Sequence, residues 1–378
     1  MPDEIDPTEH LQLTTSERDL DSLAVQLTAW LQARVAADEP PLIESLHRPL
    51  SGGLSSASVL FDARWKSAGE TREGSYVARM VPEAGAFPVF RDYDLPLQYR
   101  IIGEIAAHTD VPVPPLRWLE TDDTVCGAPF FVMDRVDGRI PGDNPPYVFA
   151  GWLYDATPAE RAELTRNTLD ILARIHAITE PARRFPELDG PGPALRRHLA
   201  AQRDWYRWAL VDDGFEIPLI ERAFDWLERN FPDDPGPDVL SWGDARPGNI
   251  IYDGCTPIAV LDWEMVALGP REMDLAWMIF LHRFFQDIAT GFDMPGLPDF
   301  LRRDEVVAQY ENLTGHTVRD LDFHLTYAAL RHAIVMARIK RRMIHMGEDT
   351  APADRDDYIM HRATLEAMLD GTYGWDLK

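Results

Sequence analysis

The feature that most constrains the fold is a change of residue pattern near residue 140 of this 378-residue chain. Before it, short runs of β-branched and aromatic residues alternate with turn residues, and after about residue 150 apolar residues recur at helical spacing. The change coincides with a glycine- and proline-rich segment at 138–148. The order predicts an α+β fold in two lobes. We assign 1–17 to a mobile N-terminal segment, 18–137 to a β-rich N-terminal lobe and 138–378 to a larger helical lobe.

The residue pattern also predicts individual elements. In the N-terminal lobe we expect helices at 18–37 and 93–108 and strands at 59–65, 75–81, 116–120 and 129–136. The first two strands would form a hairpin closed by the turn 66–74. In the helical lobe we expect helices at 158–179, 195–211, 217–230, 271–287, 303–313, 319–346 and 354–370. A small hairpin is expected from two short apolar runs at 250–252 and 257–261.

The charge balance excludes some classes of partner. The formal net charge is −26, and a surface this acidic repels nucleic acids and anionic membranes. The acidity either serves as a solvated surface or attracts a cationic substrate. The two cysteines cannot form a disulfide scaffold or a four-cysteine zinc site. Because the N-terminus has no pattern of a signal peptide and no apolar run approaches ~20 residues, we expect a cytoplasmic protein.

The segment 240–264 contains the residues with the clearest chemistry. Asp244 and Asn249 lie five residues apart in a loop interrupted by proline and glycine, and Asp262 follows at the end of an apolar run. Each alone could be an ordinary turn or strand-end residue. Together, two carboxylates and one carboxamide are the oxygen ligands that suit Mg²⁺.

This segment resembles the catalytic loop and metal motif of the aminoglycoside phosphotransferase and choline kinase families, which have a bilobal protein-kinase-like fold. The resemblance implies transfer of the γ-phosphate of ATP to a small-molecule hydroxyl. It implies that Asp244 is the catalytic base and that Asn249 and Asp262 are metal ligands for Mg²⁺. Arg246 would place a cation near the γ-phosphate. The resemblance covers about residues 45–345 and is greatest to the branch containing the kinase-like half of acyl-CoA dehydrogenase fusion proteins.

The same resemblance implies a nucleotide site in the N-terminal lobe. A glycine-containing loop would cover the phosphates, Arg79 would contact them, and Gln98 would lie opposite Arg79 on a helix. A strand and hinge would hold the adenine. The residues implied in the loop and the hinge are Ser51, Gly52, Gly53, Ser55, Met133, Asp134 and Val136.

Three positions depart from the family pattern. Trp242 replaces a histidine that braces the loop, Arg79 replaces a lysine, and Gln98 replaces a glutamate. Asp94, four residues before Gln98, could supply the missing carboxylate. We expect Asp274 to be a structural carboxylate that holds the catalytic loop.

The acceptor stays open at this point. The family resemblance points to aminoglycosides, and the closer branch points to hydroxyacyl thioesters. A coenzyme A ester would need a basic patch, for which Arg196, Arg197 and Arg203, or Arg338, Lys340, Arg341 and Arg342, are candidates. The alternative from another class is a catalytically weak or silent nucleotide-binding or regulatory protein.

Overall fold

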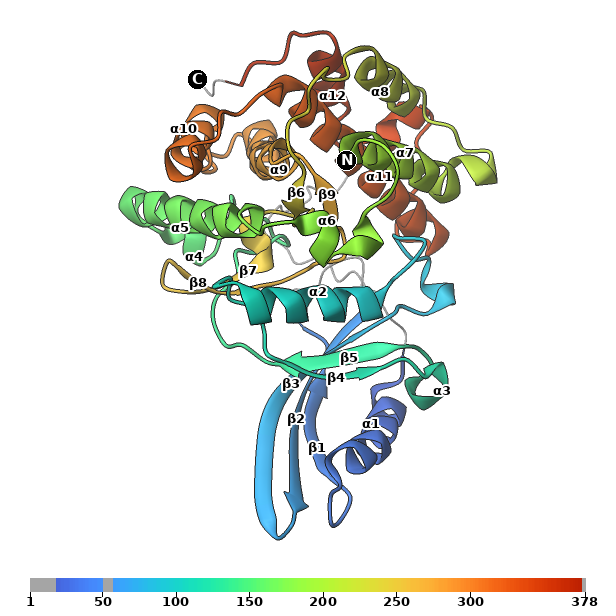
Figure 1. Cartoon of the computed structure of the whole chain (residues 1–378). Coiled ribbons are helices and arrows are strands. Elements are labelled where there is room, and N and C mark those ends of the chain that lie inside the picture. Colours follow the sequence, from blue (N-terminus) through green and yellow to red (C-terminus); the bar gives the residue numbers. More distant parts are fainter. Residues whose placement is uncertain (1–17, 50–56, 376–378) are drawn as a thin grey trace. The chain divides into compact units, whose positions relative to one another are not determined.

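The computed structural model describes residues 18–49 and 57–375. These residues form two compact units (Figure 1). Of the described residues, the sheet unit comprises 18–49 and 57–138 together with Ile258–Glu264, and the helical unit comprises Arg139–Pro257 together with residues 265–375. The predicted mobile segment, 1–17, lies outside the described residues.

The sheet unit is built on a five-stranded antiparallel sheet with the order β1-β2-β3-β5-β4. Its strands are β1 (Leu42–His47), β2 (Ala57–Ser67), β3 (Glu70–Met80), β4 (Leu116–Glu120) and β5 (Phe130–Asp134). Between β2 and β3, Ala68 and Gly69 have φ of 51° and 79°. Positive φ at both positions is typical of a type I′ turn, whose twist matches that of the flanking strands. The predicted hairpin is confirmed, with longer strands and a shorter turn than expected.

Within its described residues the sheet unit has three α-helices: α1 (Leu20–Val35), α2 (Leu95–His108) and the short α3 (Asp123–Cys126). The carboxylate of Asp19 caps α1 by accepting from the Ser22 N–H at 3.0 Å. One face of α1 is buried in a single core with the inner face of the sheet. This core contains Leu23, Leu27, Trp30, Leu31, Val59, Phe61, Tyr76, Phe130 and Val132.

The helical unit contains the other α-helices that the structure describes. They are α4 (Trp152–Asp155), α5 (Pro158–His176), α6 (Pro181–Arg184), α7 (Ala194–Ala209), α8 (Pro218–Arg229), α9 (Glu272–Gly291), α10 (Arg303–Thr314), α11 (Leu321–His345) and α12 (Arg362–Leu369). α9 packs against α10 and α11. It is buried on nearly every side from Glu272 to His282, so it forms the centre of this unit.

Two short ladders position the loop that follows β6. β6 (Val239–Ser241) pairs with β9 (Ala267–Gly269), and β7 (Ile250–Asp253) pairs with β8 (Thr256–Val260). The second pair confirms the predicted hairpin. The prediction missed β1, β6 and β9. It was also wrong to expect one helix over 354–370, because a 3₁₀ turn at Arg355–Tyr358 precedes α12. Among the described helices, none is both long and apolar enough to cross a bilayer.

Buried histidines predict a pH dependence of stability. Burial lowers the pKa of His282, His324 and His361 from 6.5 to about 4, and it lowers the pKa of His332 well below 6.5. The unfolded chain therefore binds protons that the folded chain does not between about pH 6.5 and 4. Each such histidine lowers the free energy of unfolding by up to ~1.4 kcal/mol per pH unit as the pH falls through that window.

We expect His324→Leu to flatten this dependence, because His324 is 2% exposed and its side chain would no longer titrate in the unfolded chain. Thermal unfolding midpoints measured from pH 7 to 4 would show a smaller decrease for this variant than for the unmodified chain. His108→Leu removes a histidine whose side chain is 50% exposed and serves as the matched control. Parallel pH profiles for His324→Leu and the unmodified chain would contradict the prediction.

Candidate active site

The loop after β6 is held by a buried carboxylate at the start of α9. Asp274 is fully buried and accepts hydrogen bonds from the Ser241 hydroxyl at 2.8 Å and from the backbone N–H groups of Trp242 and Gly243 at 2.8 and 2.9 Å. His176 on α5 lies 3.0 Å from the same carboxylate. Burial opposes ionisation of Asp274, but the bonds and charge of His176 and the loop donors hold its pKa below the usual value. Asp274 therefore has the structural role predicted from the sequence.

Glycine is required at position 243 in this loop. Its φ is 90°, and a Cβ atom there would lie 2.0 Å from the carbonyl oxygen of Met265. A side chain would force the loop away from the segment after β8. The next residue, Asp244, is thereby brought close to α9.

The carboxylate of Asp244 is hydrogen-bonded on both oxygens. Trp277 Nε1 donates to Oδ1 at 2.5 Å, and Asn249 Nδ2 donates to Oδ2 at 2.7 Å. Arg246 Nε lies 3.1 and 3.2 Å from the two oxygens. The Asp244 side chain keeps 15% of its surface exposed, so the carboxylate is fixed without being sealed from solvent. The structure brings together three predicted site residues, Asp244, Arg246 and Asn249.

Arg246 bridges two carboxylates. Besides Asp244, it pairs with Asp143, which precedes the cis Asn144–Pro145 peptide bond. That the Arg246 guanidinium lies beside the γ-phosphate of a bound nucleotide stays a prediction.

In the sheet unit, Arg79 and Asp262 form an ion pair. Arg79 on β3 donates to Asp262 Oδ1 at 2.5 Å and to Glu264 Oε2 at 2.9 Å. Burial alone would lower the pKa of Arg79, but the charges of Asp262 and Glu264 raise it. The acidic partners of Arg79 thus come from the segment 258–264. Asp94, which we considered as its partner, instead caps α2 by accepting from the Leu97 N–H at 2.8 Å.

Breaking this ion pair is expected to destabilise the protein. Arg79→Ala would leave two carboxylates that are 16% and 8% exposed without their cation, at a cost of about 3–5 kcal/mol of unfolding free energy. The matched control is Arg117→Ala, which removes an arginine that is 49% exposed and pairs with Asp134, and should cost at most ~1 kcal/mol. Thermal unfolding followed by circular dichroism measures the stability of both variants. Equal losses of unfolding free energy in Arg79→Ala and Arg117→Ala would contradict the prediction.

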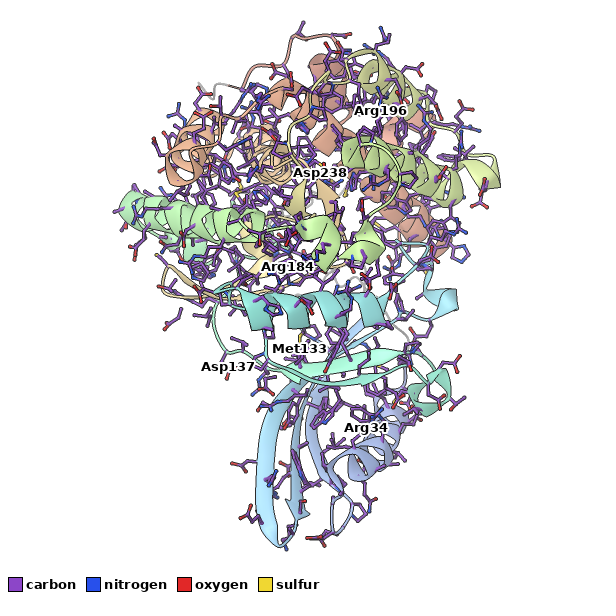
Figure 2. All side chains as sticks on the ribbon, in the orientation of Figure 1. Arg34, Met133, Asp137, Arg184, Arg196 and Asp238 are labelled. Atoms are coloured by element: carbon purple, nitrogen blue, oxygen red, sulfur yellow. The ribbon has the colours of Figure 1, made fainter. Side chains whose placement is uncertain are left out.

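The residues expected to bind adenine lie at the end of β5 and just beyond it. Met133 (labelled in Figure 2) and Asp134 are half-buried, and Arg117 holds the Asp134 carboxylate at 2.6 and 2.7 Å. The Asp134 N–H donates to the Pro115 carbonyl at 2.9 Å, so that N–H is engaged within the sheet unit. Gln98 is buried on α2 and is 5% exposed. Ser51, Gly52, Gly53 and Ser55 lie outside the described residues.

Three residues near Asp244 were missed from the sequence: His176, Trp277 and Arg331. They come from α5, α9 and α11, far along the chain from the loop. No short motif connects them to Asp244. The spacing of Trp277, three residues after Asp274, is also typical of ordinary helix packing.

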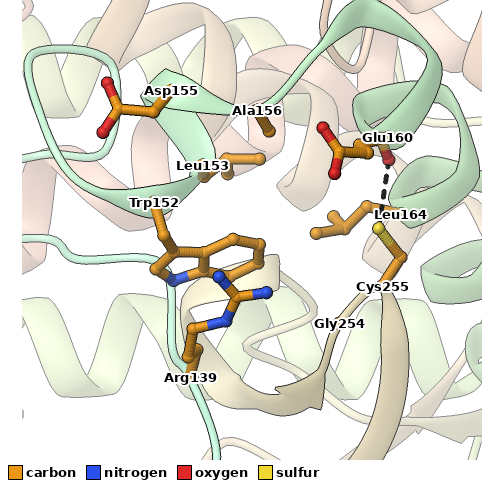
Figure 3. Close-up of a pocket in the computed structure, with 9 residues that line it drawn as sticks. All are labelled: Arg139, Trp152, Leu153, Asp155, Ala156, Glu160, Leu164, Gly254 and Cys255. Atoms are coloured by element: carbon orange, nitrogen blue, oxygen red, sulfur yellow. Dashed lines mark hydrogen bonds between the residues drawn. The ribbon is translucent and has the colours of Figure 1, made fainter.

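A pocket of about 360 Å³ lies elsewhere in the helical unit (Figure 3). Its wall includes the guanidinium of Arg139, which lies 4.6 Å from the Trp152 ring centroid, and the thiol of Cys255. None of the predicted site residues lines it.

Comparisons with known proteins agree with the predicted fold. A family model described as "Phosphotransferase enzyme family" matches residues 47–315. A solved structure described as a "putative aminoglycoside phosphotransferase" from Ralstonia eutropha has 21% identity and a TM-score of 0.62, covering 92% of this chain and 97% of that one. Aminoglycoside phosphotransferase APH(4)-Ia, solved with AMP-PNP and hygromycin B, has 16% identity and a TM-score of 0.55, covering 93% and 100%. These neighbours confirm the bilobal kinase-like fold, with a small sheet lobe and a larger helical lobe.

Curated relatives confirm the branch that the sequence resembles. The chain is 24% identical over 289 residues to an Arabidopsis thaliana protein named "Probable acyl-CoA dehydrogenase IBR3", covering 72% of this chain and 34% of that protein. The match covers 34% of that protein, and it covers 24% and 39% of the human and mouse proteins named "Acyl-CoA dehydrogenase family member 11".

Proposed function

Because the chain belongs to the phosphotransferase enzyme family, whose model matches residues 47–315, we propose that it transfers the γ-phosphoryl group of ATP to a small-molecule hydroxyl in the presence of Mg²⁺. The observation that carries this proposal is the setting of Asp244. Its carboxylate is fixed by donors to both oxygens in a loop that has Asn249 five residues later. Phosphoryl transfer depends mainly on such positioning and on charge neutralisation.

Each residue of the proposed site then has a role. Asp244 orients the acceptor hydroxyl and accepts its proton, and Arg246 provides a cation beside the transferred group. Arg79 contacts the phosphates, and Gln98 supports Arg79 from α2. The backbone of Val136 contacts the adenine. The loop with Ser51, Gly52, Gly53 and Ser55 covers the phosphates. Met133 and Asp134 complete the hinge.

The proposed metal ligands have a donor set that fits Mg²⁺. Nδ2 of Asn249 donates to both the backbone carbonyl and the carboxylate of Asp244, so its Oδ1 is the atom available to a cation. Asp262 adds a carboxylate, 16% exposed. In the part of the chain that the structure describes, no three His, Cys, Asp or Glu side chains could hold a metal by themselves. This is compatible with Mg²⁺, which often binds through one or two protein groups, waters and phosphates. Bound Mg²⁺ would neutralise charge on the phosphates.

Mg²⁺-dependent nucleotide binding and turnover test the proposal. We expect AMP-PNP to raise the unfolding temperature with Mg²⁺ present and much less with EDTA. ATP turnover would then be measured against a panel of hydroxylated amines and hydroxyacyl thioesters, with the phosphorylated product identified by ³¹P NMR. Absence of any Mg²⁺-dependent stabilisation would contradict nucleotide binding. Stabilisation without turnover would instead support the alternative of a silent nucleotide-binding or regulatory protein, which the departures at Trp242, Arg79 and Gln98 motivate.

The charges of the described residues favour a cationic or neutral acceptor over a polyanionic one. The basic residues considered for coenzyme A are largely committed to other groups: Arg338 and Arg341 donate to the Ala209 carbonyl, Arg341 also pairs with Asp213, and Lys340 pairs with Asp349. Arg196, Arg197 and Arg203 pair with Glu228, Asp189 and Glu221. The names of the curated relatives keep a hydroxyacyl thioester as the second candidate. The ratio of kcat/KM for aminoglycosides and thioesters in the panel distinguishes the two acceptor classes.

A cytoplasmic location stays a prediction.

A further inference from the structure

Trp277 contacts the proposed catalytic base through its only polar atom. It lies on α9, three residues after Asp274, and is 3% exposed. Its Nε1 donates to Asp244 Oδ1 at 2.5 Å. A buried indole N–H requires an acceptor, and the carboxylate of Asp244 provides it. The most buried helix of the unit is thus joined directly to the carboxylate.

Arg331 on α11 supports both partners of this hydrogen bond. Its guanidinium is 4.4 Å from the Trp277 ring centroid, and its Nη2 donates to the carbonyl of Gly243, the residue before Asp244, at 2.9 Å. Arg331 is 1% exposed. A planar cation stacked on an indole and bonded to the loop restrains the ring and the backbone together.

The geometry gives Trp277 a role that the other donors cannot replace. An aspartate carboxylate rotates easily about χ2, and donors to different oxygens are needed to fix its plane. Asn249 fixes Oδ2, and Trp277 fixes Oδ1 from a rigid helix. Arg246 contacts both oxygens, but its side chain is long and also pairs with Asp143, so it fixes the plane of the carboxylate less firmly.

We propose that Trp277, braced by Arg331, is a positioning residue. It sets the plane of the Asp244 carboxylate, which orients the acceptor hydroxyl and accepts its proton. The proposal rests on the proposed function, since it assumes that Asp244 is the base. It deepens that function by identifying what controls the orientation of the base. It also assigns the buried charge of Arg331 to the support of the loop.

The first experiment tests the hydrogen bond without any assay of activity. In a ¹H–¹⁵N spectrum of tryptophan-labelled protein, the Trp277 indole signal is identified by its loss in Trp277→Phe. We expect it to lie downfield of an indole in water and to move upfield in Asp244→Ala. An unchanged position in Asp244→Ala overturns the inference, whatever the enzyme does.

The second experiment separates positioning from folding. Trp277→Phe keeps an aromatic ring but removes the donor, and we expect kcat to fall by roughly 10- to 100-fold, because a hydrogen bond to a charged group has an effect of that order. The affinity for AMP-PNP with Mg²⁺ should stay within about three-fold, since Trp277 is not assigned to nucleotide binding. The double variant, Asp244→Ala with Trp277→Phe, should have a kcat no lower than that of Asp244→Ala alone, because the Trp277 donor acts only through Asp244.

The matched control is Trp152→Phe. It removes an indole N–H of the same unit that donates to the Ile140 carbonyl at 3.1 Å, and kcat should be unchanged. A kcat for Trp277→Phe within two-fold of the unmodified chain, in a folded variant, overturns the inference while leaving the proposed function intact. If the unmodified chain transfers phosphate to no acceptor and does not hydrolyse ATP, the proposed function fails instead, and the indole signal alone decides the contact.

Discussion

Asp244→Asn is expected to reduce kcat for phosphoryl transfer by about 10²–10⁴-fold, the range typical of losing a general base. Asparagine keeps the size of the side chain and can still accept the Trp277 hydrogen bond through its oxygen. It cannot accept the proton of the acceptor hydroxyl. Nucleotide affinity should change by no more than a few-fold, because Asp244 is assigned to the acceptor. Steady-state turnover with the best acceptor of the panel, together with calorimetric titration of AMP-PNP and Mg²⁺, measures both quantities.

Asp253→Asn is the control for this prediction. Asp253 is exposed at the end of β7, in the same unit, and the change removes the same charge. We expect its kcat to equal that of the unmodified chain. Retained turnover in Asp244→Asn would remove Asp244 from the role of base, and a parallel loss in Asp253→Asn would attribute the effect to net charge.

Asp274→Ala is expected to lower the free energy of unfolding by about 4–6 kcal/mol, because it leaves several buried donors without an acceptor. The four groups that lose their partner are Ser241 Oγ, the N–H groups of Trp242 and Gly243, and His176 Nε2. Urea denaturation at pH 7 would show the change in the transition of the helical unit. Turnover should fall as well, since the same donors shape the loop before Asp244.

The pKa of Asp274 provides a second test of this prediction, through its pH dependence. Its folded-state pKa lies below the usual value of 3.8, so its stabilising effect is complete above about pH 4 and is lost as the pH falls through the folded-state pKa. The stability difference between the unmodified chain and Asp274→Ala should therefore shrink as the pH falls below about 4. Asp170→Ala, which breaks an exposed pair with Arg174 on α5, should cost under ~0.5 kcal/mol. A loss no larger than this control would show that Asp274 does not anchor the loop.

Much of the fold could be predicted because its signals are local. The hairpin of β2 and β3, the strand β4 and the long helices α5, α9 and α11 follow from residue periodicity and turn residues within each segment. The missed strands have two causes. β6 and β9 have three residues each and exist because Val239–Ser241 pairs with Ala267–Gly269, which lies almost thirty residues away. β1 has a mostly exposed pattern with a register shift, so it carries no clear alternation.

For the candidate site, the sequence predicted which residues carry the chemistry. Asp244, Asn249 and Asp262 stood out because their spacing matches a known motif, and Asp274 because it opens a helix beyond them. Only the tertiary structure decided their neighbours: Trp277 and Arg331 against the loop of Asp244, and Asp262 and Glu264 as the partners of Arg79. The physical reason is that a hydrogen bond acts over about 3 Å in space, whatever the separation along the chain. Spacing in a sequence records only the contacts that a single loop or helix can make.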